Sequence, residues 1–168
     1  VAVLEKVFSF NLKGSTSDTM KSVKVFTRVE RPEEIIHQTT PRGRLLWKRY
    51  QFVNKSYDAL KERALNAVTK DPLLVFTYQS DELSLTKDLA NELLYLNREK
   101  IIILGREKSG EVRCSLRSGP DVMLPDVLQK ALVGVQGSGG GHEHACGVAV
   151  KVEDFQRFLG NLRRELGK

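Results

Sequence analysis

Residues whose side chains can do chemistry gather in one short stretch of this chain. Residues 137–147 read GSGGGHEHACG and hold five of the 13 glycines, two of the three histidines and one of the two cysteines. Three interpretations are open for such a stretch: a metal site, a phosphate-binding loop or a flexible linker. The residue types and their neighbours favour the second.

The metal interpretation depends on His142, His144 and Cys146. In an extended strand these alternate residues would all face one side, and histidine and cysteine are ligands that zinc prefers. The three glycines directly before them disfavour a continuous strand. Structural zinc sites also usually take four ligands. We therefore expect no metal ligands in this chain.

The phosphate interpretation does not rest on either common glycine-rich signature. No Gly-Lys-Ser/Thr follows the glycines, and His142 takes the place of the third glycine in GxGxxG. Glycines nevertheless let a loop approach a ligand closely and turn its N–H groups inward. Ser138 can donate a hydroxyl, and a protonated His142 can add a charge-assisted bond. On this interpretation residues 143–146 begin a short helix whose N-terminus faces the same anion.

A linker is less favoured than a phosphate-binding loop, because ionisable residues run straight from the glycines into a predicted strand without a polar spacer. A second cationic segment, VRCSLRS, lies upstream and ends at Arg117 and Ser118. Its residues alternate between an apolar side and a cationic side, as in a hairpin strand. We favour plain exposure on an edge hairpin for Arg113, and a phosphate contact opposite the glycine-rich stretch for Arg117.

Apolar spacing predicts the elements that position these residues. A helix from about 44 to 68 carries one apolar stripe, and Pro32 marks the first turn of an earlier helix. From residue 71 the order is β-α-β-β-α-loop-β-α. We therefore predict an α/β fold, with a small mixed β-sheet covered by helices and an all-helical N-terminal extension. The division falls between residues 1–70 and 71–168.

The net charge of +6 is unevenly distributed. Residues 21–63 hold eleven Lys/Arg against five Asp/Glu, whereas residues 64–168 balance at fourteen each. A basic helical third indicates either a polyanion contact or a solvated basic surface.

No apolar run is long enough to span a bilayer, no signal peptide is evident, and two cysteines are too few for a disulfide scaffold. We expect a cytoplasmic protein, and the first residue, Val1, indicates a fragment of a longer chain.

The segment SLRS, its spacing to GSGGGHEHACG, and the closing strand and helix resemble the DHH-associated C-terminal domain of the DHH phosphoesterases. The resemblance covers about residues 71–168. The form GSGGGH and the preamble LKGSTSD, then RPEEII, are most similar to archaeal RecJ-like proteins, which implies a place in DNA repair or replication.

The resemblance implies a division of labour. A preceding domain with an Asp-His-His motif would bind two manganese (or magnesium) ions and hydrolyse phosphodiesters, and this chain contains no such motif. The chain would therefore bind single-stranded DNA or RNA and cooperate with that DHH domain without cleaving by itself. The family's substrate-contacting positions correspond here to Arg117, Ser118, Ser138, Gly139, Gly140, Gly141 and His142.

Two other functions stay open at this point. The chain could be an interaction module that docks replication proteins through its basic helices. It could also belong to a phosphodiesterase of oligoribonucleotides or cyclic dinucleotides, which would use the same phosphate contacts. Aromatic stacking partners are not evident in the α/β half of the sequence, so we expect phosphate contacts to dominate over base contacts.

Overall fold

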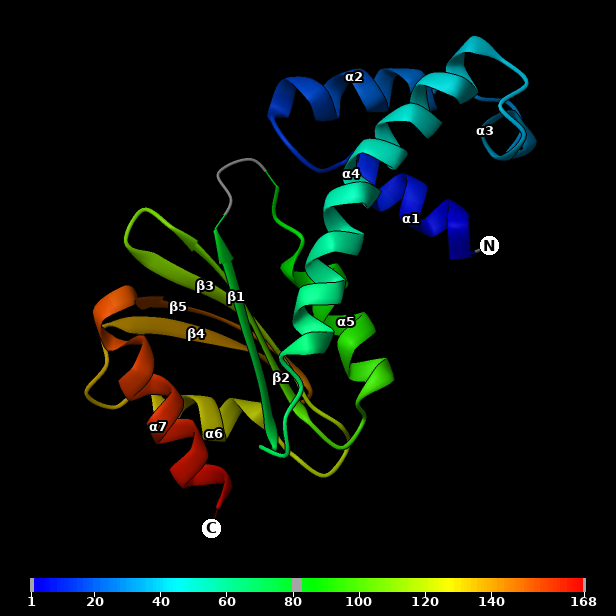
Figure 1. Ribbon diagram of the computed structural model, residues 1–168. Helices are drawn as coiled ribbons and strands as arrows, with labels where there is room; N and C mark the ends of the chain where they lie inside the picture. The colour runs from blue at the N-terminus through cyan, green and yellow to red at the C-terminus, as the bar shows by residue number, and fades with distance from the viewer. Residues whose placement is uncertain (1, 80–82, 168) are drawn as a thin grey trace. The chain divides into compact units, whose positions relative to one another are not determined.

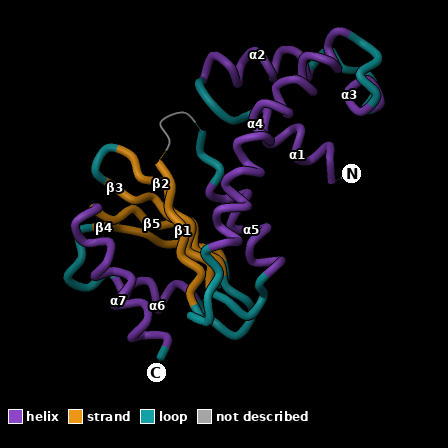
Figure 2. The backbone as a smooth tube through the Cα atoms, viewed as in Figure 1, coloured by secondary structure: helices purple, strands orange, loops and turns teal. Residues whose placement is uncertain are grey.

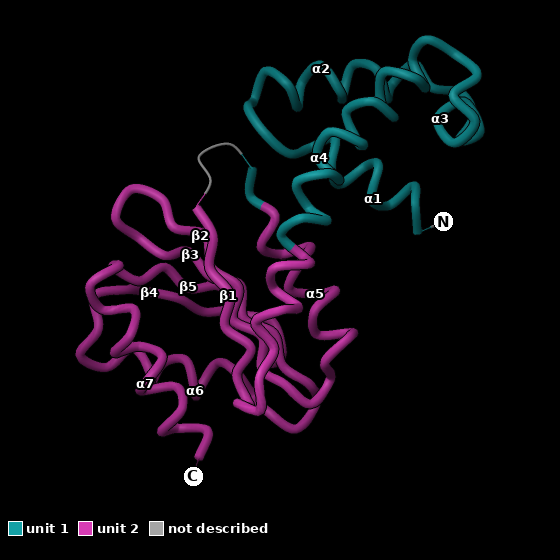
Figure 3. Tube along the Cα trace, viewed as in Figure 1, with its two compact units in different colours: residues 1–60, 82–84 teal, residues 61–81, 85–168 magenta. Residues whose placement is uncertain are grey.

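A computed structural model of the protein describes residues 2–79 and 83–167. The chain forms two compact units, one of residues 1–60 with 82–84 and the other of residues 61–81 with 85–168 (Figure 3). The division falls inside the long helix α4, whose last turn belongs to the second unit. In the described part of the chain, no helix combines the length and the apolarity that a membrane crossing needs.

The first unit is helical, as predicted. Its helices are α1 (Ala2–Asn11), α2 (Thr16–Phe26), α3 (Glu33–Ile36) and most of α4 (Pro41–Asn66). The apolar stripe predicted for the long helix is confirmed, because Leu46, Val53 and Tyr57 are fully buried. The amide of Asn11 joins α1 to α4 by donating to the carbonyls of Val7, at 2.8 Å, and Leu46, at 3.0 Å.

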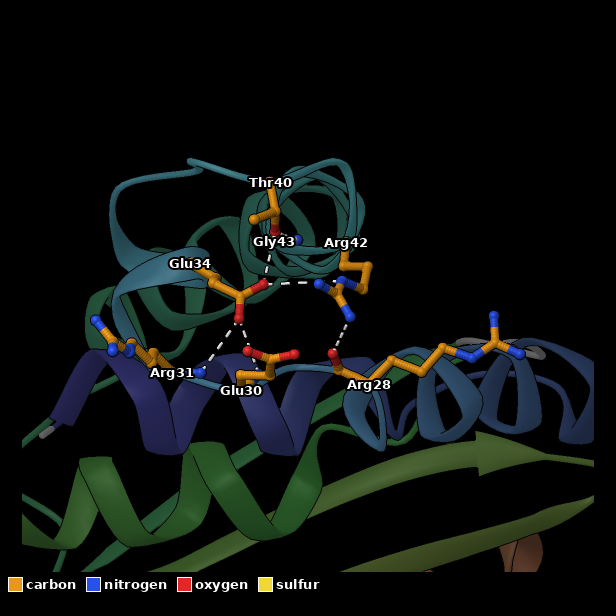
Figure 4. Close-up of polar contacts among 7 residues, drawn as sticks. All are labelled: Arg28, Glu30, Arg31, Glu34, Thr40, Arg42 and Gly43. Atoms are coloured by element: carbon orange, nitrogen blue, oxygen red, sulfur yellow. Dashed lines mark hydrogen bonds and ion pairs between the residues drawn. The ribbon is translucent and has the colours of Figure 1, made fainter.

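A buried carboxylate organises the turn between α3 and α4 (Figure 4). Glu34 accepts the backbone N–H groups of Glu30, at 2.8 Å, and Arg31, at 3.2 Å, and the Thr40 hydroxyl at 2.8 Å. Thr40 in turn accepts the Gly43 N–H at 3.1 Å, which satisfies a donor in the first turn of α4. One acidic side chain thus fixes both the turn before α3 and the start of α4.

The second unit is a five-stranded sheet with helices on its two faces (Figures 1 and 2). The strand order is β1-β2-β3-β5-β4, and only β1 and β2 run parallel. The strands are β1 (Leu73–Gln79), β2 (Ile101–Lys108), β3 (Glu111–Arg117), β4 (Gly137–His142) and β5 (Ala145–Lys151). The helices are α5 (Thr86–Leu96), α6 (Leu124–Ala131) and α7 (Phe155–Leu166), with a short 3₁₀ turn η1 (Val152–Asp154) before α7.

This mixed sheet with covering helices confirms the predicted α/β fold class. One face carries the alternate residues Val112, Cys114 and Leu116 of β3, which pack in a single apolar core with α6 and α7. The helix α5 packs on β2 and β3 instead, and Figure 1 shows it on the other side of the sheet. The strand β3 is central, so the expectation of an edge hairpin for the VRCSLRS segment was wrong.

The glycine-rich stretch is a strand, which corrects the predicted loop. Residues 137–142 pair with β5 along their whole length, a two-residue turn follows, and Ala145 begins β5 rather than a helix. Bare backbone makes this pairing possible, because a Cβ on Gly139 would lie 2.5 Å from the Gly147 carbonyl oxygen. The α6 side chain Gln129 also covers the strand edge by donating to the Gly139 carbonyl at 3.0 Å. Tertiary pairing here overrides the low strand preference of glycine.

Two neighbouring glycines of β4 give a matched test of this close approach. A Cβ on Gly140 would meet no heavy atom within 4 Å, in contrast to one on Gly139. We expect Gly139→Ala to lower the free energy of unfolding of the second unit by about 1–3 kcal/mol through overpacking. Gly140→Ala should leave it unchanged or raise it slightly. Urea unfolding followed by far-UV circular dichroism measures both, and equal stability of the two variants would contradict this account of the strand.

The Glu34 carboxylate makes the first unit sensitive to acid. Hydrogen bonds from the Glu30 N–H, and then from the Thr40 hydroxyl, hold the pKa of Glu34 below its usual value. A lowered folded-state pKa stabilises the fold above the ordinary glutamate pKa of about 4.3, and this stability is lost as pH falls through the lowered value. Glu34→Gln should therefore be less stable than the parent at neutral pH, with the difference shrinking below about pH 4.

The fluorescence of Trp47 measures this effect, because the only tryptophan packs against the core of the first unit. Glu33→Gln, which removes an exposed charge from the same helix, is the matched control. A Glu34→Gln deficit that does not change with pH would show that the carboxylate's charge is not what stabilises the turn.

Candidate phosphate-binding site

Strand register places two of the predicted site residues in one row across the sheet. Arg117 of β3 pairs with Ala145 of β5, and Ala145 pairs with His142 of β4. Paired residues of antiparallel strands present their side chains on the same face. Arg117 and His142 therefore flank a single alanine on one face of the sheet.

The next two rows extend this face with small residues. They are Ser115–Gly147–Gly140 and Arg113–Ala149–Ser138. We call Ala145, Gly147, Ala149 and Gly140 the small-residue shelf. Gly140 and Gly147 are exposed, and the two alanines are partly exposed. The shelf is therefore a nearly flat piece of backbone, bordered by arginine side chains on β3 and by polar side chains on β4.

Arg117 is held at the border of this shelf by protein groups that carry no charge. Its Nε donates to Asn91 Oδ1 of α5 at 2.7 Å, and its Nη1 donates to the Leu116 carbonyl at 2.9 Å. Partial burial lowers the pKa of Arg117, while proximity to Cys146 acts in the opposite direction. An arginine still keeps its proton in proteins. No carboxylate of the described residues forms an ion pair with Arg117, so a partly desolvated cation retains N–H donors for an anion.

Ser118 has a different environment from Arg117. Only 2% of it is exposed. Its hydroxyl donates to the Val122 carbonyl at 2.8 Å and lies 3.2 Å from Nδ1 of His144, while its N–H donates to the His144 carbonyl at 3.2 Å. Ser118 thus fastens the end of β3 to the turn between β4 and β5.

The remaining predicted residues divide between the two faces of β4. His142 and Gly140 lie on the shelf face beside Arg117, and Ser138 lies on the same face two rows further, roughly 13 Å from His142 along the strand. Gly139 and Gly141 face the other side, against the backbone of β5. The structure brings Arg117, Gly140 and His142 together; a shared role for all seven residues stays a prediction.

Sequence reasoning did not single out Asn91, and it expected Arg113 to be exposed. No local pattern marks Asn91, because its importance comes from a contact with a residue 26 positions away. Arg113 is exposed, as expected, with its Nη2 at 3.6 Å from Glu111 Oε2, but it shares the shelf face with Ser138.

The alternating histidines and cysteine do not form a ligand set. His142 pairs with Ala145, whereas Cys146 pairs with Gly141, so their side chains leave opposite faces of the sheet. The His144 Nδ1 lies 3.0 Å from the Val122 carbonyl. Burial raises the pKa of the Cys146 thiol, and raises that of Cys114 to about 12. Within residues 2–79 and 83–167, no group of three or more His, Cys, Asp or Glu side chains is placed to hold a metal ion.

The DHHA1 domain family model matches residues 72–168, which is more than half of the chain. The chain therefore belongs to the DHHA1 domain family, and the resemblance to a DHH-associated C-terminal domain is confirmed. The narrower assignment to an archaeal type stays a prediction. The comparison with curated protein sequences gave no match.

Solved structures with this fold include three of different kinds. The pGpG-specific phosphodiesterase PggH from Vibrio cholerae is 14% identical, with a TM-score of 0.59 over 91% of this chain and 51% of its own. RecJ from Thermus thermophilus, solved with Mn²⁺, is 18% identical, with a TM-score of 0.56 over 73% of this chain and 19% of its own. The C-Ala domain of Aquifex aeolicus alanyl-tRNA synthetase is 17% identical, with a TM-score of 0.50 over 57% of this chain and 91% of its own.

These likenesses establish the fold alone. The chain spans about half of the length of PggH and about a fifth of the length of RecJ.

The geometry predicts that zinc does not stabilise this protein. Because His142 and Cys146 face opposite sides of the sheet, one equivalent of Zn²⁺ should leave the thermal unfolding midpoint unchanged. Circular dichroism melting curves with and without zinc measure this, with Cys146→Ser as the matched variant. A zinc-dependent rise of the midpoint that disappears in Cys146→Ser would restore the metal interpretation.

Proposed function

We propose that the α/β unit binds the phosphates of single-stranded DNA or RNA and presents the strand to a separate DHH phosphoesterase domain of the same protein. The observation that carries the proposal is that Arg117 and His142 both pair with Ala145, so the two side chains share one face of the sheet beside an open shelf of glycine and alanine. The role is that of the substrate-binding part of a RecJ-like exonuclease.

The shelf suits a phosphate for reasons of both space and charge. Gly140 has no heavy atom within 4 Å of the position that a Cβ would take, so a phosphate oxygen can approach the strand there. Arg117 supplies a planar guanidinium with unused N–H donors on one side. The imidazole of His142 can add an N–H donor on the other side. These contacts read no base, so they predict binding that depends on salt and little on sequence.

Phosphodiester hydrolysis itself would belong to the DHH domain. We propose that this domain would hold two manganese or magnesium ions; a solved RecJ with a similar fold is in complex with Mn²⁺. This chain contains no Asp-His-His motif, so we assign it binding and orientation of the strand.

A second candidate function has one specific observation in its favour. The likeness to PggH, described as a pGpG-specific phosphodiesterase, covers 91% of this chain. In such an enzyme the same shelf would hold the phosphates of a dinucleotide instead of a long strand. Affinities for oligonucleotides of increasing length separate the two functions, because a long-strand binder gains affinity with each added phosphate contact and a dinucleotide binder does not.

We expect Arg117→Ala to weaken binding of a labelled single-stranded oligonucleotide about tenfold or more, since hydrogen bonds to charged groups contribute about 1.5–3 kcal/mol. His142→Ala should also weaken binding, but by less than Arg117→Ala, because the neutral imidazole offers a single N–H donor. Fluorescence anisotropy titrations between roughly 50 and 200 mM salt measure both effects.

Arg164→Ala is the control, because it removes the same charge from α7, which packs on the opposite face of the sheet. Equal effects of Arg117→Ala and Arg164→Ala, or an affinity that does not change with salt, would overturn the proposal. If the Arg117→Ala variant still pulled down replication proteins in that case, the alternative of an interaction module that docks replication proteins would be favoured.

A further inference from the structure

A pocket of about 400 Å³ opens beside Arg117 in the second unit. It lies between the C-terminal half of α5 and the segments at the end of the sheet, namely the residues after β3 and the turn between β4 and β5. Its lining includes Asn91, Leu94, Tyr95, Arg98, Pro120 and His144. Its volume is within the usual range for small-ligand sites.

One wall of the pocket is suited to a flat aromatic ligand. Tyr95 is 69% exposed, although it is a large aromatic residue on a helix that packs against the sheet. The Arg98 guanidinium lies 5.2 Å from the centre of its ring. Leu94 and Pro120 add apolar surface. An exposed ring and a planar cation are the groups on which unstacked nucleobases stack in proteins.

The contacts of His144 indicate which of its two ring nitrogens is the hydrogen-bond acceptor. Its Nδ1 lies 3.0 Å from the Val122 carbonyl, and a carbonyl oxygen only accepts, so Nδ1 carries the hydrogen. The Ser118 hydroxyl donates to the same Val122 carbonyl and also lies within hydrogen-bond distance of His144 Nδ1. Val122 and Ser118 together therefore orient the His144 ring. In the neutral ring, Nε2 is therefore the acceptor that remains for a ligand in the pocket that His144 lines.

The pocket and the phosphate shelf share a residue. Asn91 lines the pocket and accepts the Arg117 Nε–H at 2.7 Å. The end of the pocket is also closely packed, because a Cβ on Gly119 would lie 3.0 Å from the Arg98 carbonyl oxygen. An anion on Arg117 would thus sit next to a preformed pocket with an aromatic wall and one acceptor.

We propose that this pocket binds a nucleobase of the strand whose phosphate Arg117 holds. The base would stack on the Tyr95–Arg98 pair and donate an N–H to Nε2 of His144. Each of the four common bases has an N–H donor on its pairing edge, so we expect all four to bind. This inference rests on the proposed function, and it replaces the expectation that the α/β half lacks an aromatic stacking partner.

The test compares two ligands with the same phosphates. One is a short single-stranded oligonucleotide, and the other is a strand of equal length in which every nucleotide is a tetrahydrofuran abasic unit. The wild-type chain should bind the base-bearing strand about tenfold more tightly. Tyr95→Ala should reduce this ratio to about twofold while leaving the abasic affinity unchanged, and Tyr95→Phe should preserve the ratio.

Phe52→Ala is the matched control. Phe52 is 57% exposed and has the Arg49 guanidinium 5.2 Å from its ring, so it repeats the Tyr95–Arg98 arrangement in the helical unit. It should leave the ratio unchanged. Far-UV circular dichroism checks that each variant is folded. We expect both variants to fold, because the side chains of Tyr95 and Phe52 are exposed.

The outcomes separate this inference from the proposal on which it rests. Arg117→Ala should weaken binding of both strands by the same factor. Unchanged affinity for both strands in Arg117→Ala would overturn the phosphate site, whereas the Tyr95-dependent ratio tests the base pocket separately. Equal affinity of the wild type for both strands, or an equal loss for both in Tyr95→Ala, would overturn the base pocket. The same loss of ratio in Phe52→Ala would also overturn it.

Discussion

The pairing of the glycine strand β4 with β5 is the constraint on which the candidate site depends. Side chains alternate between the two faces of a sheet, so a slip of one residue in this pairing would move His142 to the opposite face from Arg117. The glycines permit the register that is observed, because side chains on Gly137 and Gly139 would meet the β5 backbone. The glycine-rich strand β4 thus determines whether His142 lies on the same face of the sheet as Arg117.

That register gives the sheet one face that packs into the apolar core and one face that carries the candidate site. Apolar residues of β3 and β5 fill a core with α6 and α7, and this burial supplies most of the stabilisation expected of the unit. The opposite face is covered by α5 over β2 and β3, while β5 and β4 present glycine and alanine there together with Ser138, His142 and, at the far end of β5, Lys151. Arg117 lies at the boundary between the covered and open parts, where Asn91 of α5 orients it.

The boundary position of Arg117 also explains how the proposed phosphate and base contacts would be neighbours. The end of β3 leads into Ser118, which ties the β4–β5 turn to the chain near Val122 and so orients His144. The same segment forms one side of the pocket whose other side is α5. A rigid framework of this kind reduces the ordering cost of binding a flexible strand.

The sequence by itself determined the elements with strong periodicity and the residues with distinctive chemistry. The apolar stripe of α4, the alternation of β3 and the terminal stripe of α7 were predictable because each is a local pattern. Arg117 and His142 stood out by residue type, and SLRS with the glycine-rich stretch indicated the family. Only the tertiary structure decided that GSGGGH is a strand, that Arg117 and His142 share a row, and that Asn91, Tyr95 and His144 border one pocket. Those facts depend on contacts between residues far apart in the chain, which no local propensity encodes.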